Sequence, residues 1–518
     1  MIRAARDGIR RLTTLTEGPT VAAATPTEAD PIASNAAVTH ATVGRVASVW
    51  GDDPDGPFAA TLAFRIGEAD ERLGTRGRCH LVRALVLDDL DTSGVQVRVS
   101  ITTLRTRFGV TGDDRAVART LTTIARRLNA LRTDRADELI PDALASWRPP
   151  ERWDTQLMSL RFGSRGYGLP ALPLLGLEDL DRVAFDQWVR SWFTGSNAVF
   201  SANRRPSADL DLSALGEGVR KPLPDPRPVD RPLPGVAAGP DGRLAISFLG
   251  RFDATAMLLL DLILDRIHAR CTAIDPQIGR PVAVVRRTGS SLATVALSIA
   301  APNDVIAPIS AAMSSELFAI AMAGPDADEL DQARIAFRRS RYRASDGGSL
   351  AVEESALDSL FGENRDPRAA LRASRAGFAR RLRDGLARAI WLLPDEVAVT
   401  DRRLVAIRTG ADTVADGVVF EPTTGASTGD DGARLVLAAE GIVLTASSGL
   451  KTSISFADVV AVQVHQNDHR TVWGEDGARV HIDPTSWTDG ARIIDAVDTA
   501  VEPWVLLRST VTSAGQHR

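Results

Sequence analysis

The sequence has little cysteine and no long apolar run. Its two cysteines, Cys79 and Cys271, are too few for a disulfide framework or a thiolate zinc cluster. The most apolar stretch, Ala256–Leu264, is far shorter than the roughly 20 residues of a membrane-spanning helix, and it contains Asp261. The first residues are basic but lack the apolar segment of a signal peptide. We therefore expect a cytoplasmic, reduced protein with no membrane span.

Lysine is also scarce, since it occurs only at Lys221 and Lys451. The 61 basic and 66 acidic residues give a formal charge of -5. Nucleic-acid binding needs a basic surface or a concentrated basic stripe, so the composition argues against nucleic acid as a partner. With 44% hydrophobic and 25% charged residues, the chain of 518 residues should be globular. A chain of this length is typical of three or four domains.

Residues 42–220 show strands followed by helices. Alternation predicts strands at 61–66, 95–102 and 197–201, and helical spacing of apolar residues predicts helices at 77–88, 113–132, 137–147 and 178–193. The preceding residues 1–41, whose later part is rich in Ala, Thr and Pro, are predicted to be a mobile leader.

Residues 221–235 contain six prolines and mark the clearest boundary in the chain. Such a run cannot pack as a helix or a central strand. It predicts a stiff, extended linker that spans about 40 Å; the alternative is an ordinary surface loop.

Residues 236–402 repeat the order of elements of the first half. We predict strands at 244–248, 282–287 and 292–300, and helices at 254–271, 303–323, 326–343, 348–360 and 366–391. Two strand-led units joined by a proline linker suggest a tandem duplication.

Residues 403–510 change to short strands separated by Gly and Asp turns, followed by a helix at 488–504. This pattern predicts a small β-roll closed by a C-terminal helix, which resembles a pleckstrin-homology-like domain, with a tail at 511–518. The predicted fold class is therefore α+β: two related halves, each an antiparallel sheet with helices, followed by the roll.

Three stretches of the first half resemble the pitrilysin (insulinase-like) family of zinc metallopeptidases. They are Ala60–Gly67 with Asp70, Glu71 and Gly77; Arg161–Gly168 with Leu175–Leu177; and Asp186–Phe193 with Asn197–Val199. Together with the duplicated second half, the resemblance covers about residues 42–400. It implies two peptidase-like halves whose zinc lies on the first helix.

The family's chemistry resides in an H-x-x-E-H motif on that helix. The two histidines bind zinc and the glutamate activates the metal-bound water. At the corresponding positions this chain has His80, Arg83 in place of the glutamate, and Ala84 in place of the second histidine.

These replacements predict that the zinc site is lost. Alanine has no lone pair, and a guanidinium cannot accept a proton. A like-charge contact at 4 Å also costs about 4 kcal/mol near a protein surface. Glu138 and Glu151 lie where the resemblance places a third ligand, but one histidine and one glutamate do not make a zinc site. His80 is then an ordinary helix histidine, and we expect no metal, no cofactor and no catalytic residue.

In two-subunit members of the family, the metal-free subunit contributes an Arg and a Tyr that hold the substrate backbone. Arg270, at the end of the predicted helix 254–271, is a candidate for that arginine. The tyrosine is absent, because Val282–Val285 occupies its region. Arg270 is therefore either a peptide contact or a solvated residue that favours the helix C-terminus.

Two further patterns are interpreted as non-catalytic. His465 and His469 are four residues apart, but the flanking alternation places them at a strand end and turn, so we interpret them as polar loop residues. Gly163–Gly168 is as rich in glycine as a nucleotide loop, but it has no lysine and no preceding strand.

The leading hypothesis is an inactive pitrilysin-like subunit that forms part of a peptide-holding chamber. Its expected partners are an unfolded peptide and a subunit with an intact zinc motif, which would perform the proteolysis, or a second copy of this chain. The alternative is a non-enzymatic scaffold that binds a protein through the C-terminal roll.

Overall fold

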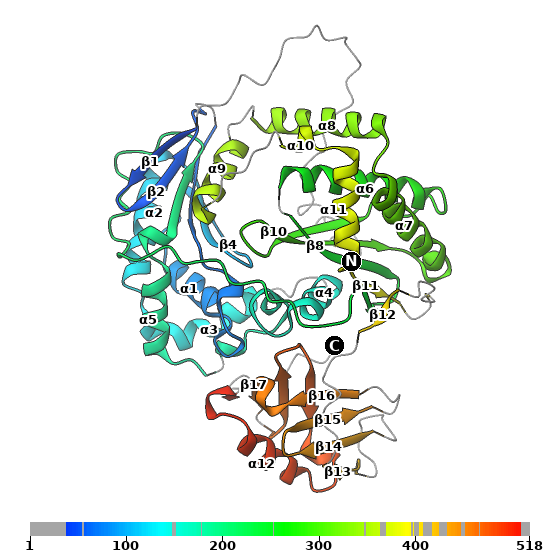
Figure 1. Cartoon of the computed structure of the whole chain (residues 1–518). Coiled ribbons are helices and arrows are strands. Elements are labelled where there is room, and N and C mark those ends of the chain that lie inside the picture. The colour runs from blue at the N-terminus through cyan, green and yellow to red at the C-terminus, as the bar shows by residue number, and fades with distance from the viewer. Residues whose placement is uncertain are drawn as a thin grey trace, which may run out of the picture. The chain divides into compact units, whose positions relative to one another are not determined.

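The computed structural model describes residues 38–508, apart from 54–55, 148–151, 178, 252, 346–348, 363–368, 395–396, 398–402, 408–416, 424–432, 447–450 and 466. Within this part, three separate apolar cores correspond to a first half, a second half and a C-terminal roll. The fold is α+β (Figure 1).

The first half is built on a six-stranded sheet with the order β1-β2-β6-β3-β5-β4. The strands are β1 (Thr39–Val43), β2 (Val46–Trp50), β3 (Phe58–Phe64), β4 (Val95–Ile101), β5 (Thr106–Gly112) and β6 (Ala198–Ala202). The helices that share its core are α1 (Arg78–Leu87), α2 (Asp114–Asn129), α3 (Ala136–Ser146) and α5 (Arg182–Trp192). Alternation along β3 explains the layering, because Phe58, Leu62 and Phe64 are buried against these helices.

The second half repeats this topology over five strands, with the strand order β12-β7-β11-β8-β10-β9. Its edge strand β12 differs, since it pairs in parallel with β7, whereas β1 pairs antiparallel with β2. Its strands are β7 (Gly235–Ala238), β8 (Arg243–Arg251), β9 (Val282–Arg287), β10 (Leu292–Ala300), β11 (Ile390–Leu393) and β12 (Val405–Ala406). Its helices are α6 (Ala254–Thr272), α7 (Asn303–Ala323), α8 (Ala327–Ser345), α10 (Ala369–Arg372) and α11 (Arg375–Leu386). In both halves the central strands pair in the same directions, including one parallel pair, β2·β6 and β7·β11. The halves are therefore related as predicted, but their sheets are mixed rather than wholly antiparallel.

Two helices lie on the sheet of the opposite half. α4 (Arg152–Phe162) follows the first-half helices in sequence, yet it packs on β8, β10 and β11 of the second sheet. α9 (Ser349–Phe361) belongs to the second half in sequence, yet it packs on β2 and β6 of the first sheet (Figure 1). Each sheet is thus covered on its second face by a helix from the other half.

The structure corrects two sequence predictions about element bounds. The predicted helix 366–391 is interrupted, since α11 ends at Leu386 and residues 390–393 form strand β11. The reason is that Ile390–Leu393 is buried between β7 and β8, where an apolar run fits a central strand. The predicted leader to residue 41 also extends too far, because β1 begins at Thr39 and pairs with β2; residues 1–37 lie outside the described part.

The proline-rich segment is not a free spacer. Its backbone oxygens accept hydrogen bonds from buried side chains of the first half: Arg65 donates to Pro222, and Tyr167 Oη donates to Pro224 at 3.0 Å. The amide of Val229 donates to Arg161 O at 2.8 Å. The segment therefore packs along the first half before β7 begins at Gly235.

Helix α7 is long and apolar enough to cross a membrane by length and composition alone. In the structure, Ile306, Ile309, Met313 and Leu317 are buried in the second core. Since α7 packs against α6 and α11, it serves here as a core helix.

In its described residues, the C-terminal roll has two four-stranded sheets and one α-helix. One sheet has β13 (Val418–Phe420), β14 (Arg434–Ala438), β15 (Gly441–Thr445) and β16 (Lys451–Ser455). The other has β17 (Val459–Val464), β18 (Arg470–Gly474), β19 (Arg479–Ile482) and β20 (Leu506–Arg508). Helix α12 (Gly490–Ala500) buries Ile493, Ile494 and Val497 between them, as its apolar stripe predicted. The chain does not end on this helix, because β20 follows it and pairs in parallel with β17.

Candidate functional site

The start of helix α1 is fixed by a buried carboxylate. Glu71 accepts hydrogen bonds from the backbone amides of Gly77 and Cys79, each at 2.8 Å, and so satisfies the open N-terminus of the helix. Burial raises the pKa of Glu71. Gly77 has φ +107°, and a Cβ there would lie 2.6 Å from Leu177 Cγ, so this position requires glycine.

His80 contacts a carboxylate of the same half. Its Nε2 lies 3.5 Å from Glu68 Oε1, and the same oxygen accepts a hydrogen bond from Arg76 Nη2 at 3.1 Å. Burial alone would raise the pKa of Glu68, but the contact with His80 and the charge of Arg76 hold that pKa below its ordinary value. His80 is 8% exposed and therefore lies buried beside the ion pair of Glu68 and Arg76.

The other two motif positions offer no metal ligand. Arg83, half-buried, lies one turn beyond His80 and makes no ion pair with any residue of the described part. Ala84 packs against the first core. Neither a guanidinium nor a methyl group has a lone pair for a cation.

The residues considered for a third ligand are not gathered at this helix. Helix α3 does pack on α1, but Glu138 is 65% exposed on it and pairs with Arg135 at 3.0 Å. Glu151 lies outside the described residues. Within the described ranges, no three His, Cys, Asp or Glu side chains lie close enough together to hold a metal ion.

A cavity of about 430 Å³ opens beside this turn of α1. Glu68, His80 and Arg83 form one wall. The opposite walls are β4, at the edge of the first sheet, and Arg286 on β9, at the edge of the second sheet. Arg286 pairs with Asp154, which is buried on α4. The position of the family's zinc motif thus lies in a cleft between the edge strands of the two halves.

Arg270 does not line this cavity. It is exposed in the last turn of α6, where a cation interacts favourably with the helix dipole. The strand that would carry the tyrosine, β9, begins with the exposed Val282.

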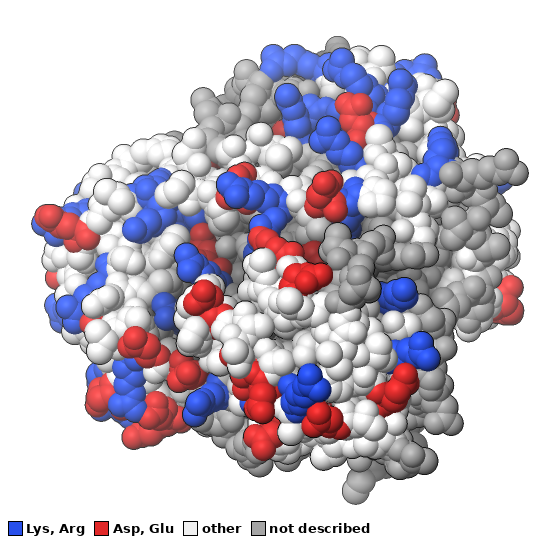
Figure 2. Space-filling model, turned by 60° about the horizontal axis from the view of Figure 1, so that its bottom comes forward, with Lys and Arg blue, Asp and Glu red and all other residues white. Residues whose placement is uncertain are grey.

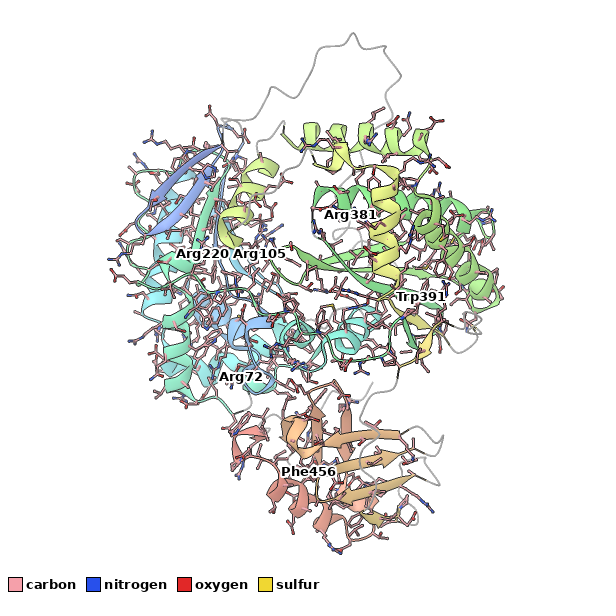
Figure 3. All side chains as sticks on the ribbon, viewed as in Figure 1. Arg72, Arg105, Arg220, Arg381, Trp391 and Phe456 are labelled. Atoms are coloured by element: carbon pink, nitrogen blue, oxygen red, sulfur yellow. The ribbon has the colours of Figure 1, made fainter. Side chains whose placement is uncertain are left out.

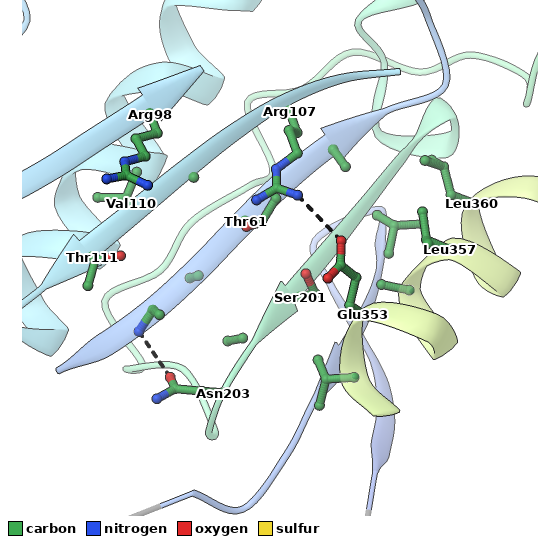
Figure 4. A pocket seen from close by; sticks show the side chains of 18 of the residues that line it. Thr61, Arg98, Arg107, Val110, Thr111, Ser201, Asn203, Glu353, Leu357 and Leu360 are labelled. Atoms are coloured by element: carbon green, nitrogen blue, oxygen red, sulfur yellow. Dashed lines mark hydrogen bonds and ion pairs between the residues drawn. The ribbon is translucent and has the colours of Figure 1, made fainter. Parts of the chain in front are cut away.

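A second cavity, of about 350 Å³, lies between the first sheet and α9. Glu353 of α9 pairs with Arg107 at 3.4 Å (Figure 4). It also pairs with Arg105 at 3.7 Å. Arg105 and Arg220 both contact α9, Arg220 through Ser359 O (Figure 3). No pattern in the sequence indicates this cavity, because its two walls come from different halves.

A histidine cluster in the roll was also missed. Thr471 Oγ1 lies 3.0 Å from both His465 Nε2 and His481 Nδ1, and His469 Nε2 lies 3.2 Å from Asp483 Oδ1. Partial burial and the neighbouring His469 and His465 lower the pKa of His481 to about 4. His465 and His469 are loop-end residues as interpreted, but β19 brings His481 between them. His465 follows β17, His469 precedes β18 and His481 lies on β19. This placement of three histidines on consecutive strands is the sequence pattern that could have indicated the cluster.

Comparison with known proteins finds no matching protein-family profile and no matching curated protein. Comparison with solved structures finds similar folds. One is the peptidase M16 inactive domain from Pseudomonas fluorescens, with a TM-score of 0.55 and 10% identity, covering 68% of this chain and 97% of that chain. Another is the first half of the periplasmic protease PqqL from Escherichia coli, with a TM-score of 0.55 and 13% identity, covering 68% and 91%.

A third similar structure is complex III2 from Candida albicans with Inz-5 bound, with a TM-score of 0.55 and 12% identity. The match covers 71% of this chain and 99% of that chain. At these identities the likeness concerns the fold. The two halves of this chain therefore have the fold of the M16 peptidase-like proteins.

Proposed function

We propose that this chain is a catalytically inactive, pitrilysin-like subunit that holds an extended peptide. One observation carries the proposal: α1 has Arg83 and Ala84 where the family's motif has its glutamate and second histidine, and its histidine, His80, already contacts Glu68. Hydrolysis through a bound zinc requires several ligands and a base. Because a guanidinium cannot accept a proton, the chemistry would come from a partner subunit with an intact motif.

The edge strands supply the means of holding a peptide. β4 and β9 each end their sheet, so each has one side of its backbone without a partner strand in the described structure. An extended peptide binds such an edge through main-chain hydrogen bonds, with little need for particular side chains. Both strands border the cavity beside α1, which supports a peptide path along this cleft.

Zinc content and cleavage test the proposal. We expect purified full-length chain to hold less than one zinc per chain, to leave an unfolded fluorescent peptide uncleaved, and to bind that peptide in an anisotropy titration. Cleavage should appear when the chain is co-expressed in the cytoplasm with a paralogue that has an intact H-x-x-E-H motif. One tightly held zinc per chain, with hydrolysis abolished by His80→Ala, would overturn the proposal.

A second candidate function is protein binding through the C-terminal roll. Trp504 is 68% exposed, and Val418 and Val419 are exposed on the edge strand β13. Basic and acidic side chains are interspersed over the lower part of the face in Figure 2. This mixture suits a protein partner better than an anionic lipid surface.

Surface variants distinguish the two functions without removing the roll, whose Trp473 and Leu507 pack against the first half. If the roll is the working part, Trp504→Ala and Val419→Lys should abolish capture of a partner protein while anisotropy with the peptide is unchanged. If the peptide cleft is the working part, the same variants should leave both assembly with the paralogue and peptide binding intact.

A further inference from the structure

The cavity beside α1 has buried hydrogen-bonding groups without partners. His80 is 92% buried, yet neither of its ring nitrogens makes a hydrogen bond with a described residue; the 3.5 Å contact of Nε2 with Glu68 is too long for one. Arg83, on the same wall, has no ion-pair partner in the described part. Buried polar groups in native proteins are almost always paired, so the unpaired ring nitrogens of His80 indicate a missing ligand, and the half-buried Arg83 lies beside them on the same wall.

One cation in the cavity wall makes no ion pair with a described residue. Glu68 is paired with Arg76, and Asp154 is paired with Arg286. Arg83 is the guanidinium of the cavity wall that makes no ion pair with a described residue; the third carboxylate nearby, Glu71, interacts with Arg76 and His80 and does not line the cavity. The cavity therefore favours a ligand with a single negative charge, and a dianion would bring excess negative charge beside Glu68.

The walls suit a small group on an extended chain. Ser100 of β4 and Ser146 of α3 add hydroxyl groups, and Trp147 adds an apolar face. A volume of about 430 Å³ holds one side chain or one chain end. A guanidinium matches a carboxylate with two parallel hydrogen bonds.

We propose that the site where the family binds zinc binds a carboxylate in this chain, with Arg83 as its principal donor. The carboxylate is that of an acidic side chain or of the C-terminus of a peptide lying along β4. The peptide part rests on the proposed function, whereas the carboxylate site does not.

Butyrate alone tests the site. We expect saturation-transfer NMR with the full chain to show saturable binding of butyrate and none of butyramide. Arg83→Gln should weaken butyrate binding at least about tenfold, since hydrogen bonds to charged groups are among the stronger ones, and Arg83→Lys should restore part of it. Arg119→Gln, on the exposed face of α2, is the matched control and should bind like the original chain.

The outcomes separate this inference from the proposed function. Equal signals for butyrate and butyramide, butyrate binding unchanged in Arg83→Gln, or tighter binding of inorganic phosphate than of butyrate would overturn the carboxylate site. Butyrate binding that needs Arg83, with no binding of any peptide, would leave the site standing and overturn peptide holding.

Labelled peptides identify the source of the carboxylate. One pair differs by Glu or Gln at a central position, and a second pair differs by a free or amidated C-terminus. We expect one of these pairs to differ about tenfold in affinity for the original chain and to become equal in Arg83→Gln. Equal affinities within both pairs would overturn the peptide part.

Discussion

Single residues in this chain act through partners that are far away in sequence. Gly163 is an example: it has φ +68°, and a Cβ there would lie 2.0 Å from Glu475 O in the roll. The adjacent amide of Ser164 donates to the same oxygen at 2.9 Å. The glycine-rich segment 163–168 therefore brings the backbone of the first half against a turn of the roll, and nucleotide binding is not needed to explain it.

We expect Gly163→Ala to loosen the contact between the first half and the roll. The added methyl group cannot fit without moving the backbone at Glu475, and it also disfavours the positive φ. Hydrogen exchange should become faster at Ser164 and in the turn at 474–478. Gly166→Ala is the matched control, since Gly166 also has a positive φ, of +47°, but nothing lies within 4 Å of its Cβ position. Equal exchange in the two variants would contradict the packing role.

At this scale the sequence predicts the loss of a zinc motif, which stays a prediction, but it could not predict the contacts of the residues at those positions. The replacements Arg83 and Ala84 are visible from spacing within one helix. The contacts of His80 with Glu68, and of Arg83 with a cavity wall from β4, depend on how separate elements pack. Residue spacing alone carries no such information.

At the scale of elements, regular patterns predicted helices and strands well. The helices α2 and α7 and the strands β9 and β10 lie close to their predicted bounds. The reason is that α2 and α7 bury one face, β10 is buried over most of its length, and β9 packs partly buried against the second core. Helix α4 was not predicted, since its apolar residues face two different surfaces: Trp153 and Leu157 contact the second sheet, and Met158 and Phe162 contact a first-half cluster. Such a helix has no single apolar stripe.

The histidine cluster of the roll predicts a pH dependence for these strands. The pKa of His481 is lowered from 6.5 to about 4 in the folded roll, so the unfolded chain takes up a proton on this ring first. The stability that the roll gains from a neutral His481 is therefore fully present above pH 6.5, and it is lost as the pH falls from 6.5 to about 4. The pKa of Asp483 is lowered from 3.8, so the titration of this carboxyl changes the stability only below pH 3.8.

Thermal melting of the full chain at several pH values in this window checks the prediction. The melting temperature of His481→Asn should fall less steeply than that of the original chain, because the asparagine amide does not titrate there. His40→Asn, which removes a histidine that contacts Ser355 outside the roll, should follow the original profile. Identical slopes for all three proteins would show that His481 does not cause the dependence.

At the scale of the whole molecule, the halves are joined by the exchange of α4 and α9. Arg161 of α4 donates to Ser247 O of β8 at 2.8 Å, and Glu353 of α9 pairs with Arg107 of β5 at 3.4 Å. The sequence predicted two halves and a linker, but a division of the chain by position assigns each of these helices to the wrong sheet. Contacts between distant segments had to be seen in the structure.

We expect Glu353→Arg to weaken the docking of α9 on the first sheet. The change replaces two attractions with repulsion from Arg105 and Arg107. Because these side chains are partly exposed, the effect should be about 1 kcal/mol, or about fivefold faster hydrogen exchange within α9. The swap Arg107→Glu with Glu353→Arg should recover part of the protection. Glu440→Arg, on an exposed turn of the roll, should leave α9 unchanged.

The reciprocal placement of α4 and α9 has a consequence for proteolysis. A protease that severs the chain within 221–234 would produce two fragments, each of which still carries one of the helices held by the other. The nicked protein should migrate as a single particle under native conditions and separate into two bands only after denaturation. The folded protein would then no longer need the peptide link between its two halves.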